Sequence, residues 1–359
     1  MKKGNLLSLV GGLIFLGSCA SPPLPSSYPP QPQSGFRLTA VDFYQLPGWE
    51  EDNHAEIIPA LKESCLVTRA MWCREIDKAG DGQKVKQFVE SNFQPFKVNN
   101  NGEAKGTFTG YYQVETKGSL KKTNSHQVPL LGIPSDLVEV NKVIGRYENG
   151  NFKPYFTRAE IESGILKDKA KEIIWLNDPI EAHMLHVQGS GMIKLDNGQT
   201  IKVGFAQSNG LPFKGITRIL IEKGKLEPNQ LSMLATRDWL RKNPKEAKKL
   251  MAENPRYIFF RKIEDNDSRA IGAAGIPLTF KRSIAVDNQY IPLHSLLWLN
   301  SKDAEGNNLQ RLMVAQDTGS AIKGVVRGDF FWGRGEAAFQ KAAGMKSVGE
   351  YYILKPKDF

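Results

Sequence analysis

The sequence predicts a mainly β fold with flanking helices, on two observations. From residue 257 onward the chain consists of short strand-like runs separated by turns that contain Gly and Pro, a pattern typical of a barrel or a sandwich. In the middle of the chain, residues 106–115 are strand-like, and residues 183–207 read as a hairpin meander with a tight turn at Asp196-Asn197-Gly198. The expected C-terminal strands are YIFFRKI, RSIAVD, SLLWLN, LMVAQD and EYYILKP.

Helices are expected around these strands. Near the N-terminus, residues 55–71 and 85–93 carry apolar side chains at helical spacing, and Pro95 is expected to stop the second of these helices. The other expected helices are ITRILIEKGKL, NQLSMLATRDWLRKN, KEAKKLMAEN and, between the C-terminal strands, GEAAFQKAAGM.

The first 35 residues indicate export and membrane attachment. Residues 1–18 combine two lysines with an apolar core that is too short to span a bilayer, which predicts a signal peptide. Leu16-Gly17-Ser18-Cys19 resembles a bacterial lipobox, so we expect Cys19 to be lipidated; the alternative is an ordinary signal peptide with an incidental cysteine. Residues 19–35 form a Pro/Ser-rich tether. Because Ala20 and not Asp follows the cysteine, the expected location is the outer membrane, facing the periplasm.

Composition limits the partners of the chain. With 359 residues, 40% hydrophobic and 24% charged, the chain has the length of one large or two ordinary globular domains. Its formal net charge is +10, but the basic residues are scattered and no nucleic-acid-binding signature occurs. We therefore expect no nucleic-acid partner and a cationic surface that suits an acidic polymer or an anionic membrane.

Two cysteines remain in the exported part of the chain. Cys65 and Cys73 are eight residues apart, and an oxidising compartment permits a disulfide between them. The alternative is a pair of separate buried thiols. Their spacing matches no zinc site.

Three aspartates carry the candidate chemistry. Asp287, Asp317 and Asp329 each follow a similar apolar run, so they could meet in one cleft at the ends of neighbouring barrel strands. Taken singly, each could be a turn former, since Asp bonds its own backbone. Asp329 precedes Phe330, Phe331 and Trp332; apolar rings disfavour a charged carboxylate, which raises its pKa and suits a general acid. Trp332 could also stack on a sugar ring.

Other catalytic chemistries find no support in the sequence. The histidines form no His-Glu-x-x-His motif, although His183 and His186 lie three apart, and no metal site is expected. Gly189-Ser190-Gly191 lacks the elbow of a serine hydrolase. No nucleotide-binding loop occurs, so no cofactor is expected.

Several motifs in sequence order resemble one known family. SIAVDNQYIPLHSLLWL and LMVAQDTGSAIKGVVRGDFFWG resemble the C-terminal three-aspartate domain of the membrane-bound lytic murein transglycosylase A family. GTFTGYY, YFTRAEIESGIL, VQGSGMIKLDNGQTIKVGFAQSNG and NPRYIFF resemble that family's own domain. The resemblance covers about residues 40–359.

The resemblance implies a fold and an activity. The implied fold is a double-psi β-barrel domain (36–106 plus 255–359, with the three-aspartate segment at 280–359) into which a smaller β-barrel substrate-binding domain (107–254) is inserted, with a groove between them. The implied activity is cleavage of the β-1,4 bond between N-acetylmuramic acid and N-acetylglucosamine in peptidoglycan strands, forming 1,6-anhydro ends in cell-wall turnover. Two alternatives stay open: a hydrolytic glycosidase that uses an Asp pair, and a lipoprotein that only binds glycan.

The resemblance also assigns roles to residues. Asp329, in RGDFFWG, would be the catalytic acid and base, Asp317 its supporting neighbour, and Asp287 the weakest of the three candidates. Ser320 departs from the Gly-Gly expected there and puts a side chain where the resemblance implies a close approach of the backbone to the sugar. The candidate substrate-binding residues are Gly110, Tyr111, Tyr112, Gln188, Gly189, Ser190, Gly191, Gln207, Asn209, Gly210, Gly319, Lys323 and Trp332.

Overall fold

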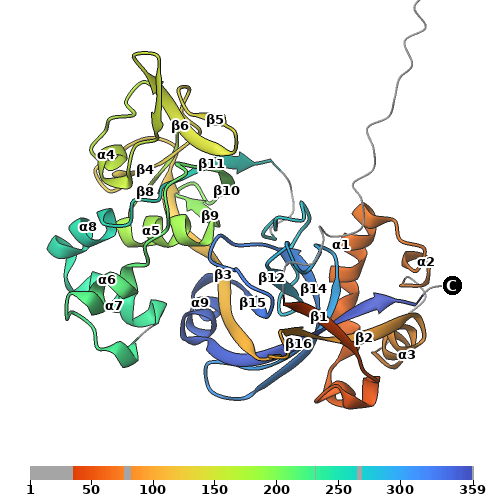
Figure 1. Cartoon of the computed structure of the whole chain (residues 1–359). Helices are drawn as coiled ribbons and strands as arrows, with labels where there is room; N and C mark the ends of the chain where they lie inside the picture. The colour runs from red at the N-terminus through yellow and green to blue at the C-terminus, as the bar shows by residue number, and fades with distance from the viewer. Residues whose placement is uncertain (1–34, 77–81, 231, 265–268, 358–359) are drawn as a thin grey trace, which may run out of the picture.

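The computed structural model describes residues 35–76, 82–230, 232–264 and 269–357. The predicted signal peptide, Cys19 and the tether up to residue 34 lie outside these ranges. No helix within them is long and apolar enough to cross a membrane. The described chain forms two lobes, and the long strand β3 (Gly106–Ser119) runs through both (Figure 1). The architecture is mainly β with flanking helices, as the sequence predicts.

Six strands close into a barrel in the larger lobe. Around the ring, β3 pairs with β15, β15 with β12, β12 with β14, β14 with β13, β13 with β16, and β16 with β3 again. The β3–β15 and β12–β14 pairs are parallel, and the other four are antiparallel. The remaining bounds are β12 (Ser283–Val286), β13 (Leu296–Lys302), β14 (Asn308–Asp317), β15 (Arg327–Arg334) and β16 (Lys346–Pro356).

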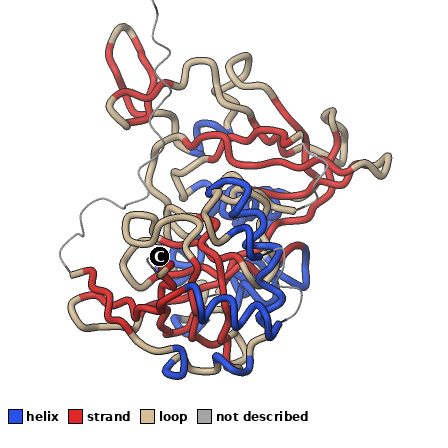
Figure 2. The backbone as a smooth tube through the Cα atoms, turned by 90° about the vertical axis from the view of Figure 1, so that its right-hand side faces the viewer, coloured by secondary structure: helices blue, strands red, loops and turns tan. Residues whose placement is uncertain are grey.

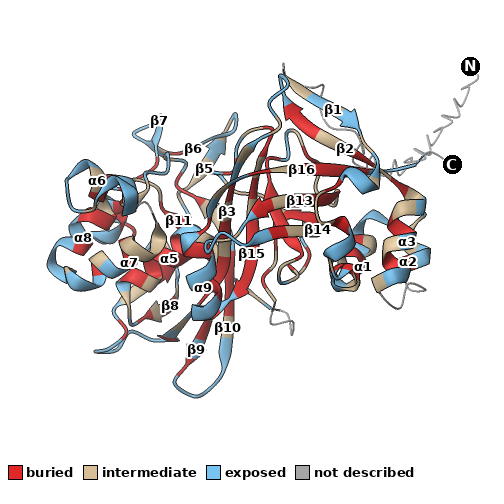
Figure 3. Ribbon diagram, turned by 90° about the horizontal axis from the view of Figure 1, so that it is seen from below, coloured by how far each residue is buried: buried red, intermediate tan, exposed pale blue. Residues whose placement is uncertain are grey.

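The barrel strands are the most buried part of this lobe (Figure 3). Phe330 has no exposed surface, and Phe331 and Trp332 keep only 4% and 6% of theirs. β1 (Phe36–Ala40) and β2 (Phe93–Asn100) continue the sheet beyond β16. α9 (Gly335–Gly344) packs on β3 and β15, where Phe339 meets the ring of Tyr112. Apolar burial of this kind is the main stabilisation of the barrel.

Three helices cover the other side of the barrel: α1 (Ile58–Thr68), α2 (Cys73–Ile76) and α3 (Gly82–Asn92). Cys65 and Cys73 form a disulfide that joins α1 to α2, which confirms that prediction. The second expected helix ends at Asn92, and Pro95 lies within β2, a strand that the sequence patterns did not indicate.

The smaller lobe contains a curved sheet in the order β4–β8–β3–β9–β10–β11. Because β11 pairs with β10, this sheet continues to Ile263, beyond the boundary at 254 that we expected. A separate three-stranded sheet, β5–β6–β7, lies at the tip of the lobe (Figure 1). The bounds are β4 (Val128–Leu131), β5 (Val138–Val140), β6 (Val143–Glu148), β7 (Asn151–Pro154), β8 (Glu172–Leu176), β9 (Ser190–Leu195), β10 (Thr200–Ser208) and β11 (Ile258–Ile263).

The helices of the smaller lobe lie below its tip, which consists of strands and loops (Figure 2). They are α4 (Arg158–Glu162), α5 (Pro179–Gln188), α6 (Ile216–Glu222), α7 (Met233–Lys242) and α8 (Pro244–Ala252). The last three were expected from the sequence.

The meander prediction is half right. β9 and β10 form the expected hairpin, but residues 183–188 belong to α5 and not to a strand. The local cause is a strong helix start and stop: the Asp178 carboxylate accepts hydrogen bonds from the backbone N–H groups of Ile180 and Glu181, Pro179 occupies the first turn, and Gly189 ends the helix at φ 79°.

Candidate active site

Asp317 and Asp329 lie on either side of one short strand. β12 is sandwiched between β14 and β15, and its Ala285 is the register partner of both aspartates. Their Cα atoms are therefore two strand spacings apart, about 10 Å. Asp317 ends its strand as expected, but Asp329 does not, because β15 begins at Arg327 and Asp329 is its third residue. Barrel closure thus brings these two predicted acids to one place.

Asp329 is held by a short hydrogen-bonded chain. The Thr109 hydroxyl donates to Asp329 Oδ1 at 2.6 Å, and Arg327 Nη2 donates to the Thr109 hydroxyl oxygen at 2.8 Å. Burial raises the pKa of Asp329 to about 6 by disfavouring its charged form, and the nearby Asp317 charge adds to this, while the Thr109 hydrogen bond and the Arg327 charge oppose it. A carboxyl group with such a pKa holds a proton close to neutral pH, as a general acid must.

Asp317 is held by two backbone N–H groups. Its Oδ1 accepts hydrogen bonds from the backbone N–H groups of Ala273 (2.8 Å) and Thr318 (2.9 Å). Burial raises the pKa of Asp317, and these two N–H donors oppose the rise by favouring the charged carboxylate.

Tyr111 connects the two acids to an apolar wall. Its ring packs on Phe331 with 5.1 Å between ring centroids. Its hydroxyl is buried and, among the described residues, has no hydrogen-bond partner of ordinary geometry. Burial and the charges of Asp317 and Asp329 raise the pKa of Tyr111. The hydroxyl therefore stays protonated, and Asp317 is the acceptor that it favours in the charged form, since a hydrogen bond from Tyr111 lowers the pKa of Asp317.

Asp287, the third predicted acid, is engaged in holding a loop. It is 2% exposed, its Oδ2 accepts from the Gly324 N–H at 2.9 Å, and its Oδ1 accepts from the Gln289 N–H at 3.2 Å. Lys323 Nζ lies 3.7 Å from Oδ1. Asp287 and Lys323 thus form a pair that ties the segment before β15 to the end of β12.

The predicted residues on β3 and β15 have packing tasks. Trp332 donates its indole N–H to the Met345 sulfur at 3.4 Å, and its ring lies over Gly110, where an added Cβ would come within 2.7 Å of the indole. Tyr112 is 3% exposed and packs on Phe339. Gly110 is thus required by the close approach of Trp332, and of the two tyrosines only Tyr111 borders the acids.

The predicted residues at the α5–β9 junction surround the point where β3 passes between the lobes. Gln188 Oε1 accepts from the backbone N–H of Tyr112 at 3.3 Å. Gly189 ends α5 at positive φ, Ser190 starts β9, and an added Cβ at Gly191 would meet Leu185 at 2.2 Å. These residues fix the course of the backbone at the junction.

Asn209 has no exposed surface and ties three segments together. Its amide donates to the carbonyls of Phe156 and Pro255, both at 2.8 Å, and its Oδ1 accepts from the Tyr257 N–H at 2.9 Å. This gives Asn209 a structural task instead of the substrate contact expected from the sequence. Its neighbours Gln207 and Gly210 keep exposed surface.

Gly319 follows the Asp317 strand. An added Cβ at Gly319 would meet Ile322 at 2.8 Å, whereas the departure from the family pattern, Ser320, is exposed. The Ser320 side chain therefore adds polar surface without disturbing the packing of this loop.

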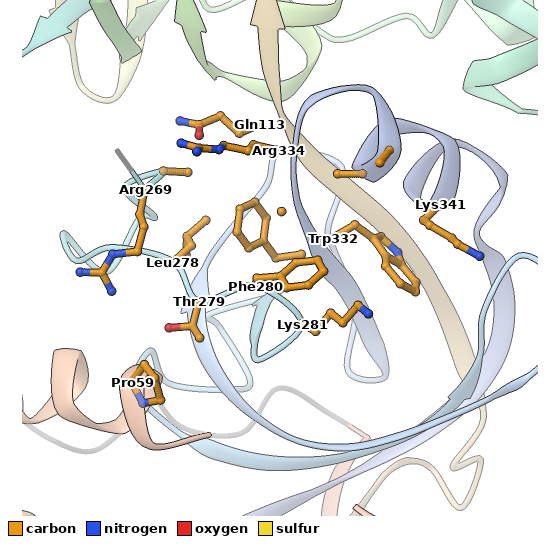
Figure 4. Close-up of a pocket in the computed structure, with 15 residues that line it drawn as sticks. Pro59, Gln113, Arg269, Leu278, Thr279, Phe280, Lys281, Trp332, Arg334 and Lys341 are labelled. Carbon is orange, nitrogen blue, oxygen red and sulfur yellow. The ribbon is translucent and has the colours of Figure 1, made fainter. Parts of the chain in front are cut away.

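A cavity of about 600 Å³ is lined in part by Phe331, the ring on which Tyr111 packs. Figure 4 shows the residues around this cavity. Neither aspartate lines it; Phe331 forms the wall that it shares with the Tyr111 side, together with Ala270 and Leu278. Its floor is apolar and its rim is basic, and Phe280 stands at the rim with 55% of its surface exposed. The lining residues are Pro59, Gln113, Arg269, Ala270, Leu278, Thr279, Phe280, Lys281, Phe331, Trp332, Gly333, Arg334, Ala337, Ala338 and Lys341.

The described parts of the chain contain no cluster of side chains suited to binding a metal ion. No group of three or more His, Cys, Asp or Glu side chains there could hold an ion. His183 and His186 are buried on α5, and burial holds the pKa values of both well below the ordinary value, so they are neutral.

Thr109 and Arg327 were not predicted. Arg327 is visible in the sequence only as the basic residue of the R-x-D segment, and Thr109 stands inside GTFTGYY. Nothing local connects them, because 218 residues separate them and only the parallel β3–β15 pairing brings them together.

Comparisons with known proteins agree with this geometry. Residues 107–261 match the MltA specific insert domain, and residues 282–355 match the 3D domain. The crystal structure of MltA from Neisseria gonorrhoeae is 32% identical, with a TM-score of 0.79, and the match covers 94% of this chain and 98% of that one. The chain belongs to the MltA family.

Two Escherichia coli members of the MltA family extend the comparison. The protein named membrane-bound lytic murein transglycosylase A is 29% identical over 292 residues, 79% of this chain and 73% of the relative. A crystal structure of E. coli MltA with bound chitohexaose shares the fold at a TM-score of 0.72 and 22% identity, and the match covers 91% of this chain and 95% of that one.

Proposed function

We propose that this chain is a peptidoglycan lytic transglycosylase. It cleaves the β-1,4 bond between N-acetylmuramic acid and N-acetylglucosamine and leaves 1,6-anhydromuramic acid ends. The observation that carries the proposal is Asp329, a partly exposed carboxyl group with a pKa of about 6 in a chain of the MltA family. A second carboxylate, Asp317, lies two strands away, and no cofactor is required.

The reaction needs one group that acts first as an acid and then as a base. Asp329 gives its proton to the glycosidic oxygen, and the C1–O bond breaks with its electron pair moving to the leaving sugar. The resulting Asp329 carboxylate removes the proton from the C6 hydroxyl of the muramic acid while O6 bonds to C1. The proton returns to Asp329, no water is consumed, and the enzyme is regenerated.

Asp317 supports this reaction electrostatically. Its negative charge helps to keep the proton on Asp329, and the same charge stabilises the positive oxocarbenium character that develops at C1. The buried Tyr111 hydroxyl stays protonated and, as a hydrogen-bond donor, helps to keep Asp317 charged. Asp287 acts through the loop that it holds.

The cavity that Phe331 lines binds the neighbouring part of the glycan strand. Sugar rings stack on aromatic faces, and the exposed ring of Phe280 offers such a face at the rim. We expect Phe280→Ala to raise KM for glycan several-fold while kcat changes little, measured by initial rates on purified sacculi. An unchanged KM would remove Phe280 from the binding surface. Exposed Phe213, outside the cavity, is the matched control.

The finer architecture follows from the same proposal. The closed six-stranded ring is a double-psi β-barrel, and the smaller lobe is a substrate-binding barrel inserted into it; the family match from residue 107 supports this division. Cys19 carries the lipid that anchors the chain in the outer membrane, facing the periplasm, where peptidoglycan strands are within reach of the tether.

A hydrolytic glycosidase is the second candidate. The two-strand separation of Asp317 and Asp329 leaves room for a water molecule between the acids, as an inverting pair requires. Such an enzyme would leave reducing ends. A protein that only binds glycan would release no products.

The test of the proposal is the Asp329→Asn variant on purified sacculi. Asn has nearly the shape of Asp but cannot donate an acidic proton, so we expect glycan binding to remain and turnover to fall at least about 10²–10⁴-fold. Asp196→Asn, in the exposed β9–β10 turn, is the matched control and keeps the wild-type rate. Wild-type turnover by Asp329→Asn would show that another group is the acid.

A further inference from the structure

Three polar groups form a directed chain in the barrel wall. Asp329 on β15 is the register partner of Thr109 on β3, and Arg327 lies two residues before Asp329 on the same face of β15. Arg327 Nη2 donates to Thr109 Oγ1 at 2.8 Å, and Thr109 Oγ1 donates to Asp329 Oδ1 at 2.6 Å. We call this set the Arg327–Thr109–Asp329 relay.

The direction of this relay follows from counting protons. An arginine guanidinium has only donors, so Thr109 Oγ1 must be the acceptor of that bond. A threonine hydroxyl has one hydrogen, and Asp329 Oδ1 is the acceptor within reach. Arg327 Nη1 donates to the backbone carbonyls of Thr107 and Gly328, which holds the guanidinium in place. Thr109 is thereby oriented as a donor to Oδ1.

We propose that Thr109, aligned by Arg327, is a positioning residue that assigns the catalytic proton to Oδ2 of Asp329. Oδ1 accepts the Thr109 hydrogen bond whether Asp329 is charged or neutral. No hydrogen bond from a described residue to Oδ2 is formed, so Oδ2 is the oxygen available to substrate. The inference rests on the proposed function and deepens it by naming the oxygen that performs both proton transfers.

The consequence for the reaction is geometric. Oδ2–H protonates the glycosidic oxygen as the C1–O bond breaks, and the same Oδ2 then accepts the C6 hydroxyl proton as O6 bonds to C1. Without the relay, the proton is shared between two oxygens that point in different directions, and only one of them faces the sugar. Correct orientation of one proton donor is worth a large part of general acid catalysis.

The charged and titratable groups around Asp329 set the expected pH behaviour. They are Arg327 on the same strand, Tyr111 on β3 and Asp317 at the end of β14. Thr109 on β3 is an uncharged hydrogen-bond donor, and the β12 residue that pairs with Asp329 is Ala285. Tyr351 on β16 faces Arg327. Because the Thr109 hydrogen bond lowers the pKa of Asp329, its removal must raise that pKa.

Neutron diffraction on the full chain tests the assignment directly. With the protein in deuterated buffer at pH 5, below the pKa of Asp329, we expect deuterium on Oδ2 and the Thr109 deuteron directed at Oδ1. Deuterium on Oδ1 overturns the proposal.

Thr109→Val and Thr109→Ser test the functional consequence. Val keeps the shape but removes the hydroxyl, while Ser keeps it. In Thr109→Val we expect kcat to fall about tenfold or more and the Asp329 carboxyl titration, followed by ¹³C NMR, to move up by about one pH unit; Thr109→Ser restores both. A lower kcat with an unmoved titration would mean a merely structural role and would overturn the proposal. The NMR titration does not depend on turnover, so it tests the role of Thr109 separately from the proposed function. If wild-type protein forms no anhydro products, that result contradicts the proposed function and not the role of Thr109 in setting the pKa of Asp329.

Discussion

Replacing Asp329 by Asn should raise the free energy of unfolding, and the gain should appear only above the pKa of an exposed aspartate. The pKa of Asp329 is about 6 in the fold, against 3.8 for an exposed aspartate, because burial disfavours its charged form. The folded state therefore holds the proton more tightly than the unfolded state, and ionisation costs folding free energy as pH rises through that window. The difference of about two pH units corresponds to about 3 kcal/mol at 1.36 kcal/mol per unit.

The assay is urea unfolding of wild type and Asp329→Asn at pH 4 and pH 8, followed by tryptophan fluorescence. We expect nearly equal stability at pH 4, where Asp329 is protonated, and a gain of up to about 3 kcal/mol for the variant at pH 8. Glu336→Gln is the control of opposite sign: Arg237 lowers the pKa of Glu336 to about 2, so its stabilising contribution is present above the unfolded pKa and Gln loses it at pH 8. A pH-independent difference for Asp329→Asn would refute this reasoning.

Three further predictions concern other residues. Asp317→Asn removes a neighbouring negative charge, so it should lower the pKa of Asp329 and move the alkaline limb of the kcat/KM profile to lower pH. The loss of rate should be smaller than in Asp329→Asn. An alkaline limb that moves to higher pH would contradict this prediction. Replacing Cys65 and Cys73 by Ser should lower the free energy of unfolding by about 2.5 kcal/mol, as expected for a closed loop of eight residues. Urea titrations of the variant and the wild type measure this difference. An unchanged midpoint would show that the disulfide does not contribute to stability. Cys19→Ser should abolish incorporation of labelled palmitate in cells, and persistent labelling would refute the lipidation site.

The sequence predicted the elements whose periodicity is unambiguous. The C-terminal strands are short apolar runs bounded by turn residues, the β9–β10 hairpin has a clear Asp-Asn-Gly turn, and α6–α8 carry helical spacing, so these elements were found. Residues 183–188 were misassigned because six apolar and polar residues fit either period, and the cap at Asp178 decided the outcome. β2 was missed because Pro95 was taken only as the end of a helix.

Residue types and their order in the chain predicted part of the candidate site. The sequence named Asp317 and Asp329 and predicted a raised pKa for Asp329 from its aromatic neighbours, and the structure raises that pKa through burial. The sequence could not identify Thr109, because Thr109 and Asp329 are 220 residues apart and meet only through the parallel pairing of β3 with β15. No local sequence pattern indicates such a pairing. For the same reason the sequence could not tell that Asn209 is buried among three segments.

The central claim, that Asp329 closes an anhydro ring without water, is tested most directly by digesting purified sacculi in H₂¹⁸O and analysing the released sugars by mass spectrometry. The account predicts muramic acid ends that are lighter than the reducing sugar by one water and carry no ¹⁸O, and it predicts that Asp329→Asn releases almost none of them. Reducing ends that contain ¹⁸O would contradict the account and would identify the hydrolytic glycosidase instead.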